Sequence, residues 1–119
     1  MTECLICEGD LQITSLSCPS CKTEYKGMFY FHRLSRLSVE NISLAEALIL
    51  HGGNLKEMAE DLNTSYPTLK RRLKALSSEL GAKKREDEDM VAKTLKDVEL
   101  KNISPEEGIK IIQEINGGV

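Results

Sequence analysis

Four cysteines in two closely spaced pairs constrain this chain more than any other feature of its sequence. Cys4 and Cys7 form one Cys-x-x-Cys pair, and Cys18 and Cys21 form the second after a gap of ten residues. With two residues between them, both sulfurs of a pair can reach one ion, and four thiolates in a tetrahedron suit zinc. The segment that holds these cysteines is too short to bury a hydrophobic core of its own and needs extra stabilisation, such as a bound metal ion. We therefore expect one structural Zn2+ per chain, with four iron-bound thiolates as the chemical alternative.

Other uses of paired cysteines fit this pattern less well. A thioredoxin-like redox site needs one pair in a βαβ context, which the sequence lacks. The first residues lack the basic and apolar regions of a signal peptide, so we expect a cytoplasmic protein, and disulfides are rare in the cytoplasm. No run approaches the roughly 20 apolar residues that a membrane span needs, so no membrane partner is expected. His32 is not expected to bind the metal, because four thiolates already complete its coordination.

The predicted fold has three segments. Residues 1–33 hold the cysteines and two β-prone runs, and they are assigned to a zinc ribbon. Residues 34–82 carry apolar side chains at helical spacing and are assigned to a trihelical helix-turn-helix domain. Residues 83–119 are assigned to a C-terminal helical hairpin, whose second helix begins at Ser104 with Pro105 in its first position. The expected fold class is therefore mainly α with a small β zinc ribbon.

Capping residues predict the helix boundaries inside the middle segment. Side-chain oxygens suit the starts of the three helices at Ser38, Asn54 and Ser65. Asn63 tolerates the left-handed conformation of a turn, and Gly81 suits the end of the third helix. The leucines of this segment are all expected to face inward, which leaves the segment no spare apolar face for self-association.

The distribution of charge singles out the third helix of the middle segment. The whole chain carries a net charge of −3, but residues 66–85 contain seven basic side chains and one acidic side chain. Such a local basic block is the electrostatic pattern of a protein that binds a polyanion. If the polyanion is DNA, the side chains expected to displace counterions from phosphates are Lys70, Arg71, Arg72 and Lys74. The alternative is an ordinary solvated helix face.

Residues 53–73 have the form of a helix-turn-helix, in which small Ala59 allows close packing of two helices. This run resembles the helix-turn-helix of the factor for inversion stimulation and of nitrogen-regulator-type activators. The resemblance implies contacts to the DNA backbone from Asn54 and Lys56. It also implies that the third helix presents five residues to DNA, namely Ser65, Tyr66, Thr68, Lys70 and Arg71.

A second resemblance covers more of the chain. A family of short bacterial proteins, catalogued as a domain of unknown function with number two thousand and eighty-nine, is similar over residues 4–21, 33–38, 53–57 and 65–68. This resemblance implies a bacterial or archaeal protein of regulator type. The family name carries no activity.

These patterns favour a DNA-binding transcriptional regulator with a structural zinc ribbon and double-stranded DNA as its partner. The alternative is a protein–protein adaptor that acts on the transcription machinery without direct DNA binding, because helix-turn-helix geometry also occurs without DNA binding. An enzyme is not expected, since the chain has two histidines, no nucleophile beside a base and no glycine-rich phosphate loop. A small-molecule substrate is not expected either.

The C-terminal segment carries more apolar side chains than a lone helical hairpin can bury: Val91, Leu95, Val98, Ile103, Ile109, Ile111, Ile112 and Ile115. They are expected to cover a second copy of the chain, its own helical core or a separate partner. We favour a homodimer through this hairpin. The acidic residues 86–89 are expected at the start of a helix, and an alternative has them fold over the basic helix as a mimic of DNA.

Overall fold

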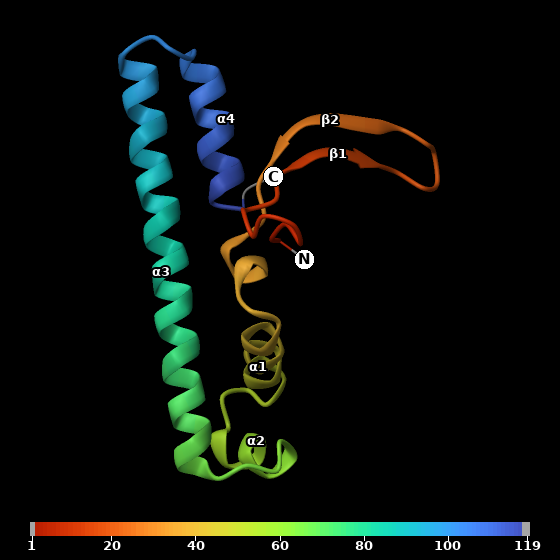
Figure 1. The fold of residues 1–119 in the computed structure, drawn as a ribbon, viewed down its shortest axis with the longest axis vertical. Coiled ribbons are helices and arrows are strands. Elements are labelled where there is room, and N and C mark those ends of the chain that lie inside the picture. The colour runs from red at the N-terminus through yellow and green to blue at the C-terminus, as the bar shows by residue number, and fades with distance from the viewer. Residues whose placement is uncertain (1, 118–119) are drawn as a thin grey trace. The chain divides into compact units, whose positions relative to one another are not determined.

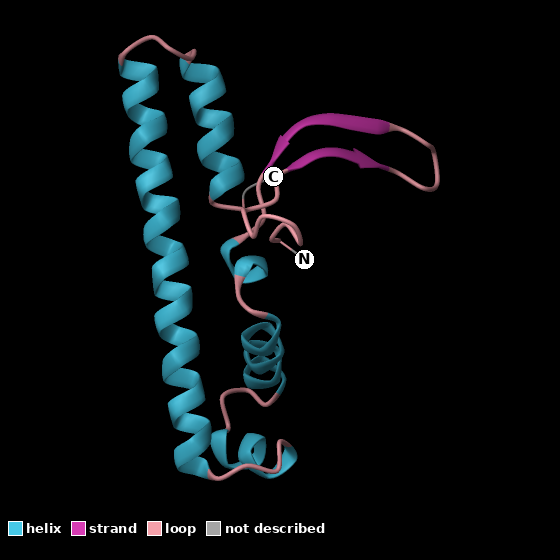
Figure 2. Ribbon diagram, viewed as in Figure 1, coloured by secondary structure: helices cyan, strands magenta, loops and turns pink. Residues whose placement is uncertain are grey.

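The computed structural model describes residues 2–117 of the 119-residue chain (Figures 1 and 2). The chain divides into two compact units: residues 37–85 form one, and the residues on both sides of that segment form the other. The predicted fold class, mainly α with a small β ribbon, is confirmed. None of the described helices is long and apolar enough to cross a membrane.

The ribbon is one antiparallel hairpin of strands β1 (Ile13–Ser17) and β2 (Glu24–Phe29), drawn in magenta in Figure 2. Leu16 pairs with Tyr25, and an irregularity between Ile13 and Ser15 shifts the register. Most side chains of both strands are exposed, so the hairpin has little core of its own. A two-stranded sheet of this kind is marginal by itself, which agrees with the expected need for a metal.

The 37–85 unit contains α1 (Val39–Leu50), α2 (Leu55–Asp61) and the first turns of α3 (Tyr66–Glu99). Their inner faces form one core, made of Leu37, Leu44, Met58, Ala59, Leu69 and Leu76. Met58 and Leu69 are fully buried. The prediction that this segment has no spare apolar face is wrong, because the outer face of α1 leaves apolar side chains exposed, including Val39, Ile49 and Leu50.

The predicted caps of this unit are confirmed. The side chain of Ser38 accepts a hydrogen bond from the N–H of Asn41, and Asn54 accepts one from Glu57. The Ser65 hydroxyl accepts the N–H of Thr68 at 3.3 Å. These bonds satisfy N–H groups that have no partner inside a helix, so each helix begins where the sequence indicated.

Glu79, the one acidic residue of the basic block, also holds the start of α1. Its carboxylate accepts hydrogen bonds from the N–H of Ser38 at 2.6 Å and from the side-chain amide of Asn41 at 2.5 Å. At the other end of α1, His51 Nε2 lies 3.1 Å from the carboxylate of Asp61 on α2. Polar contacts therefore fix both ends of α1 beside the apolar core.

The predicted end of the third helix at Gly81 is wrong. Helix α3 runs without interruption for 34 residues, through Gly81 and through the acidic residues 86–89. A glycine inside a helix costs only about 1 kcal/mol relative to alanine, which the good helix formers around it offset. The acidic run therefore lies in the middle of a helix and not at its start, and the predicted domain boundary after residue 82 falls inside α3.

The second unit combines the ribbon, a short 3-10 helix at Arg33–Arg36, the end of α3 and α4 (Pro105–Ile115). The predicted start of α4 is confirmed, because Ser104 caps it and Pro105 follows. The end of α3 and α4 lie side by side as a helical hairpin (Figure 1), and Gly108 of α4 packs closely against Val98 of α3.

The acidic run contributes an ion-pair cluster to this second unit. Asp87 is 3% exposed, and its carboxylate accepts hydrogen bonds from Arg33 Nε at 3.0 Å and from Arg36 Nη2. Glu86 lies 3.8 Å from Arg36. This pairing replaces the alternative in which the acidic run folds over the basic helix, since Asp87 is engaged by two arginines of its own unit.

The C-terminal hairpin covers, fully or in part, six of the eight apolar side chains that were expected to need a partner. Ile115 is 2% exposed, while Leu95 and Ile109 remain 56% and 59% exposed. The five other apolar side chains of the set are half-buried: Val91, Val98, Ile103, Ile111 and Ile112. The apolar surplus is therefore small, and dimerisation through this hairpin stays a prediction.

Substitution of Gly81 tests the continuity of α3. A Cβ added at Gly81 meets only the end of the Arg85 side chain, at 3.6 Å. We expect Gly81→Ala to raise the free energy of unfolding by up to about 1 kcal/mol, because alanine favours a helix interior. Gly108→Ala is the matched control and should destabilise, since its Cβ would overlap Val98. A destabilising Gly81→Ala in urea unfolding would place the helix end at Gly81 after all.

Loss of the Asp87 carboxylate tests the ion-pair cluster. We expect Asp87→Ala to lower the free energy of unfolding by about 2 kcal/mol, because Arg33 would lose its carboxylate partner and Arg36 would keep only the more distant Glu86. Glu88→Ala, one residue further along the same helix and exposed, is the control and should have little effect. Equal effects of the two substitutions would argue against the cluster.

Candidate functional site

The first cysteine pair lies in a tight turn closed by two backbone hydrogen bonds. The N–H of Cys4 donates to the carbonyl of Gly9 at 2.8 Å, and the N–H of Glu8 donates to the carbonyl of Cys4 at 3.0 Å. A Cβ added at Gly9 would lie 3.3 Å from the sulfur of Cys7, so glycine leaves room for that thiol. We call residues 4–9 the first knuckle.

The second cysteine pair repeats the same turn. The N–H of Cys18 donates to the carbonyl of Thr23, and the N–H of Lys22 donates to the carbonyl of Cys18, both at 2.8 Å. The hydroxyl of Thr23 lies 3.0 Å from the sulfur of Cys21. We call residues 18–23 the second knuckle.

The two knuckles also share a left-handed residue directly after their second cysteine. Glu8 has φ of 60° and Lys22 has φ of 64°. This conformation disfavours residues other than glycine and asparagine, and it persists only where the surrounding bonds demand it. These turns could not be predicted from the amino-acid sequence, because neither position is a glycine. Two equal hydrogen-bond patterns with the same strained residue indicate that both turns are built to present a pair of thiols.

The local electrostatics favour the thiolate form in each knuckle. Hydrogen bonds from the backbone N–H groups of Cys7 and Ile6 lower the pKa of the Cys4 thiol. The Thr23 hydroxyl and backbone N–H lower the pKa of the Cys21 thiol in the same way. Thiolate is the form that binds a metal ion, so each pair has the donor chemistry of half a tetrahedral zinc site.

The structure brings the cysteines together in pairs but not as a set of four. All four are free thiols. Within residues 2–117, no three His, Cys, Asp or Glu side chains are grouped closely enough to hold a metal ion. Strand β1 separates the knuckles, because the second one forms the turn between β1 and β2 (Figure 1). The donor set therefore fits zinc in each half, and one four-thiolate site requires the two knuckles to converge.

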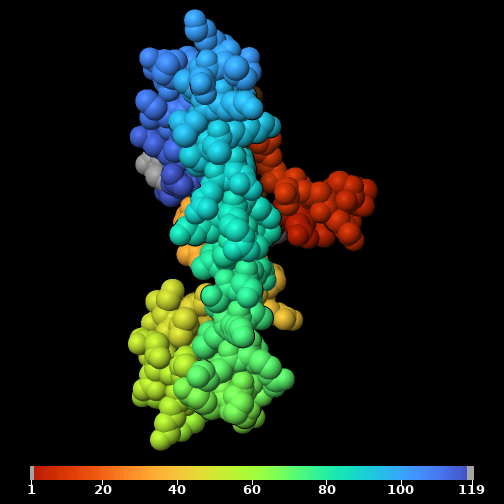
Figure 3. All heavy atoms as spheres, turned by 90° about the vertical axis from the view of Figure 1, so that its left-hand side faces the viewer, coloured from red at the N-terminus to blue at the C-terminus, as the bar shows by residue number. Residues whose placement is uncertain are grey.

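The helix-turn-helix consists of α2, the turn at Asn63 and the first turns of α3. Asn63 has φ of 52°, the left-handed conformation predicted for it, and its neighbour Thr64 donates its N–H to the carbonyl of Ala59. Ala59 is buried at this corner, which confirms its role in close packing. The side chains of the first turns of α3 form an outer surface of the 37–85 unit, green in Figure 3.

Two family models match the chain. One, described as the DUF2089 zinc ribbon, matches residues 4–35, and one described as the domain of unknown function (DUF2089)-HTH matches residues 37–83. Together they span about two thirds of the chain, and both parts of one family occur here in order. The chain belongs to the DUF2089 family. No curated protein and no solved structure matches it. The resemblance to the factor for inversion stimulation stays a prediction.

The DUF2089 helix-turn-helix exposes most of the residues predicted to contact DNA. Eight are exposed, namely Asn54, Lys56, Ser65, Tyr66, Lys70, Arg71, Arg72 and Lys74, and Thr68 is half-buried. At the start of α3, the Ser65 and Thr68 hydroxyls are hydrogen-bonded at 2.7 Å, and Arg71 reaches Thr68 at 3.5 Å. The Lys70 ammonium lies 5.6 Å from the centre of the Tyr66 ring. Lys70 and Arg71 therefore each contact a neighbouring side chain on the first turns of α3.

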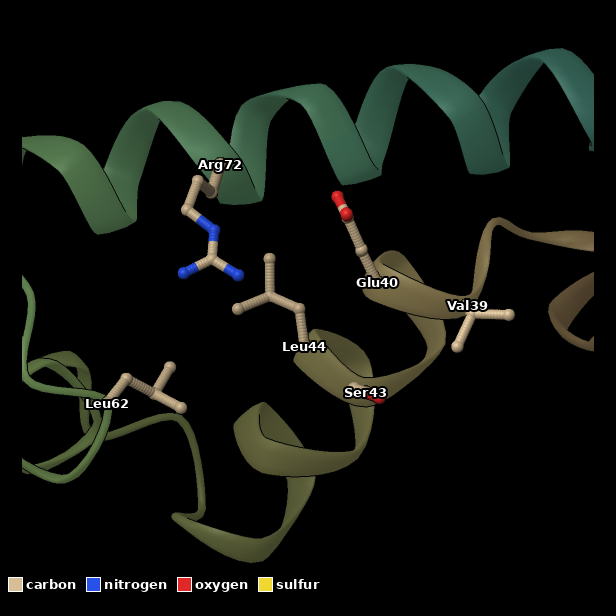
Figure 4. Close-up of a pocket in the computed structure, with 6 residues that line it drawn as sticks. All are labelled: Val39, Glu40, Ser43, Leu44, Leu62 and Arg72. Atoms are coloured by element: carbon tan, nitrogen blue, oxygen red, sulfur yellow. The ribbon is translucent and has the colours of Figure 1, made fainter.

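Arg72 lies apart from the other predicted contacts. Its side chain extends from α3 toward Leu44 and Leu62 (Figure 4). There it lines an open hollow of about 280 Å3 together with Val39, Glu40, Ser43, Leu44 and Leu62. Helical spacing could have separated Arg72 from Lys70 and Lys74, but only the packed position of α1 reveals the hollow beside it.

Proposed function

We propose that this DUF2089 protein is a DNA-binding transcriptional regulator in which α3 reads the major groove. The proposal rests on the row of exposed basic and hydroxyl side chains on the first turns of α3, which form the second helix of a well-formed helix-turn-helix. Shape and charge coincide on one helix, which is the combination expected of a DNA reader.

The exposed face of α3 divides into groups suited to different parts of DNA. Tyr66, Lys70 and Lys74 recur every fourth residue and so lie on one side of the helix. Arg71 and the hydroxyl of Thr68 occupy the adjacent row, where a guanidinium group suits the edge of a guanine. Asn54 and Lys56, at the start of α2, suit the phosphate backbone.

The acidic residue of the basic block supports this proposal by its position. Glu79 is bound to Ser38 and Asn41 at the start of α1, so its carboxylate is held outside the exposed surface of residues 66–74. The exposed residues from 66 to 74 include four basic side chains and no acidic one. Such a surface attracts a phosphate backbone despite the net negative charge of the chain.

For the ribbon, the proposal is a single structural zinc ion held by Cys4, Cys7, Cys18 and Cys21. The zinc-ribbon match and the two equivalent knuckles with thiolate-favouring hydrogen bonds support it. Zinc would supply the folding free energy that a two-stranded hairpin lacks. We propose no enzymatic reaction and no small-molecule substrate, and we propose that the protein works in the cytoplasm.

A protein–protein adaptor is the second candidate function, and one observation favours it. Leu5 and Ile6, the two residues between the first cysteines, are 83% and 94% exposed. Apolar side chains on the tip of a rigid turn suit contact with another protein. In this alternative the ribbon would bind a component of the transcription machinery, and the basic helix would be only a solvated face.

Substitution of Arg71 tests DNA binding. We expect affinity for duplex DNA to fall steeply with salt concentration, because basic side chains release counterions from the phosphates. Arg71→Ala should weaken binding to a preferred sequence by about 1–3 kcal/mol and relax specificity at one base pair. Lys93→Ala, which makes a similar charge change on α3 outside the basic block, is the control and should bind like the parent chain.

Two results of this experiment would contradict the prediction, one from the comparison of DNA sequences and one from the salt series. Equal weakening of all sequences by Arg71→Ala would assign that side chain to a phosphate. Absence of salt-dependent binding to any duplex at micromolar protein would favour the adaptor.

Metal analysis tests the ribbon. Protein purified without added metals should contain one zinc ion per chain, and a strong chelator should unfold residues 1–33, since metal-binding energy is folding energy here. Cys18→Ser should have the same effect as the chelator. Ser20→Ala, in the same knuckle but without a thiol, should keep the metal. Metal-free protein with disulfide-bonded cysteines would contradict the zinc site.

A further inference from the structure

The outer face of α1 is an apolar stripe with no packing partner in its own unit. Val39, Ile49 and Leu50 are 78%, 75% and 77% exposed, and Ile42 is 37% exposed. Val39, Ser43, Glu46 and Leu50 follow spacings of four, three and four, which place them in one row along the helix. Ile42 and Ile49 flank this row on one side. The opposite face of α1 packs against the core of the unit, where Leu44 is buried.

We infer that this stripe binds the same stripe of a second copy, with the two α1 helices antiparallel about a two-fold axis between residues 44 and 45. The axis places Val39 against the partner's Leu50, and Ser43 against the partner's Glu46. A two-fold interface must be complementary to itself, and this row meets that condition because apolar residues stand at both ends and a hydroxyl stands opposite a carboxylate.

The charge on the stripe selects the antiparallel arrangement. Glu46 is the only charged side chain in the row, and in a parallel pair it would face the partner's Glu46. Like charges across an interface are unfavourable, whereas the Ser43 hydroxyl can donate to the partner's Glu46. Antiparallel helices also place the positive end of each helix dipole near the negative end of the other.

The hollow beside Arg72 adds shape to this pairing. Val39 and Ser43, two members of the row, also line the hollow, together with Leu44 and Leu62 (Figure 4). The partner's Leu50, placed against Val39, would lie at the mouth of this hollow. Its volume of about 280 Å3 is ample for one leucine side chain. The hollow therefore serves as a socket that an exposed leucine of the second copy can fill.

The size of the surface sets the expected strength. Four exposed apolar side chains form a patch of a few hundred Å2, the size of the largest apolar patch on a typical monomer, which is often a functional site. Two such patches with their polar borders would bury on the order of 1,000 Å2, the lower end for a specific complex. We expect a dimer that dissociates in the micromolar range. If the proposed DNA-binding function holds, dimerisation would present two α3 helices to two half-sites.

Sedimentation of the full chain between about 1 and 100 µM tests the pairing, in the range expected for an interface of this size. The parent chain should show a reversible monomer–dimer equilibrium, and Leu50→Glu should weaken it by about tenfold or more, because a carboxylate would be buried in an apolar contact. Leu95→Glu is the matched control on the C-terminal hairpin, the alternative dimer interface predicted from the sequence, where Leu95 is 56% exposed. It should leave the equilibrium unchanged if α1 forms the interface. A parent chain that is monomeric throughout, or a dimer lost with Leu95→Glu and kept with Leu50→Glu, would overturn the inference.

Charge exchange at the central pair tests the register without relying on a disruptive change. Ser43→Lys should tighten the dimer about two- to fivefold through an ion pair with the partner's Glu46, and Ser43→Glu should weaken it similarly. Adding Glu46→Lys to Ser43→Glu should restore dimerisation. Failure of this restoration, with a folded chain by circular dichroism, would reject the antiparallel register.

DNA binding by the same variants separates this inference from the proposed function. If both hold, Leu50→Glu should bind a single half-site like the parent chain and lose most of its affinity for paired half-sites. A dimer that responds to Leu50→Glu in a chain that binds no DNA would keep the interface and reject the regulator. DNA binding by a chain that is always monomeric would keep the regulator and reject the α1 interface.

Discussion

One uninterrupted helix is the constraint on which the rest of the structure depends. Along its 34 residues, α3 meets different requirements in turn. Leu69 and Leu76 enter the core of the 37–85 unit, while Asp87 is buried in an ion-pair cluster of the second unit. The same helix therefore combines leucine packing in the 37–85 unit with a buried carboxylate and the apolar contact of Val98 in the second unit. The family match for the helix-turn-helix ends at residue 83, between these two parts of α3.

Local signals predicted the parts of the fold that depend on local physics. The caps at Ser38, Asn54 and Ser104 are correct, because a cap involves only residues within one turn. The end at Gly81 is wrong, since the small cost of a glycine is outweighed by its neighbours. The acidic run was also misplaced, because the partners of Asp87 are Arg33 and Arg36, more than 50 residues away in the sequence. The spacing of residues along a helix predicts contacts within a few turns and cannot predict a partner so far away in the sequence.

The candidate sites divide in the same way. The cysteine spacing predicted the positions of the four thiols. The matching turns around them could not be predicted, because their left-handed residues, Glu8 and Lys22, are not of a type that favours this conformation. Helical spacing placed Lys70 and Arg71 on an open surface, whereas the position of Arg72 beside a hollow depends on where α1 packs. The exposed stripe of α1 was missed for a related reason. Because α1 is rich in leucine and isoleucine, its sequence predicts a helix that is buried on all sides. The structure shows that only the face with Leu44 packs in the core.

The position of Glu79 has a consequence for the electric field of the 37–85 unit. Its carboxylate is held at the start of α1 by neutral donors of Ser38 and Asn41, so it keeps its negative charge but at a fixed place. A carboxylate fixed in this way cannot swing toward the first turns of α3, where the exposed residues from 66 to 74 include four basic side chains and no acidic one. In the proposed function, the field of such a surface would act over about 10 Å at moderate salt and guide the encounter with DNA before any specific contact forms. The acid that fastens α1 to α3 would thus also keep the approach path of the ligand free of negative charge.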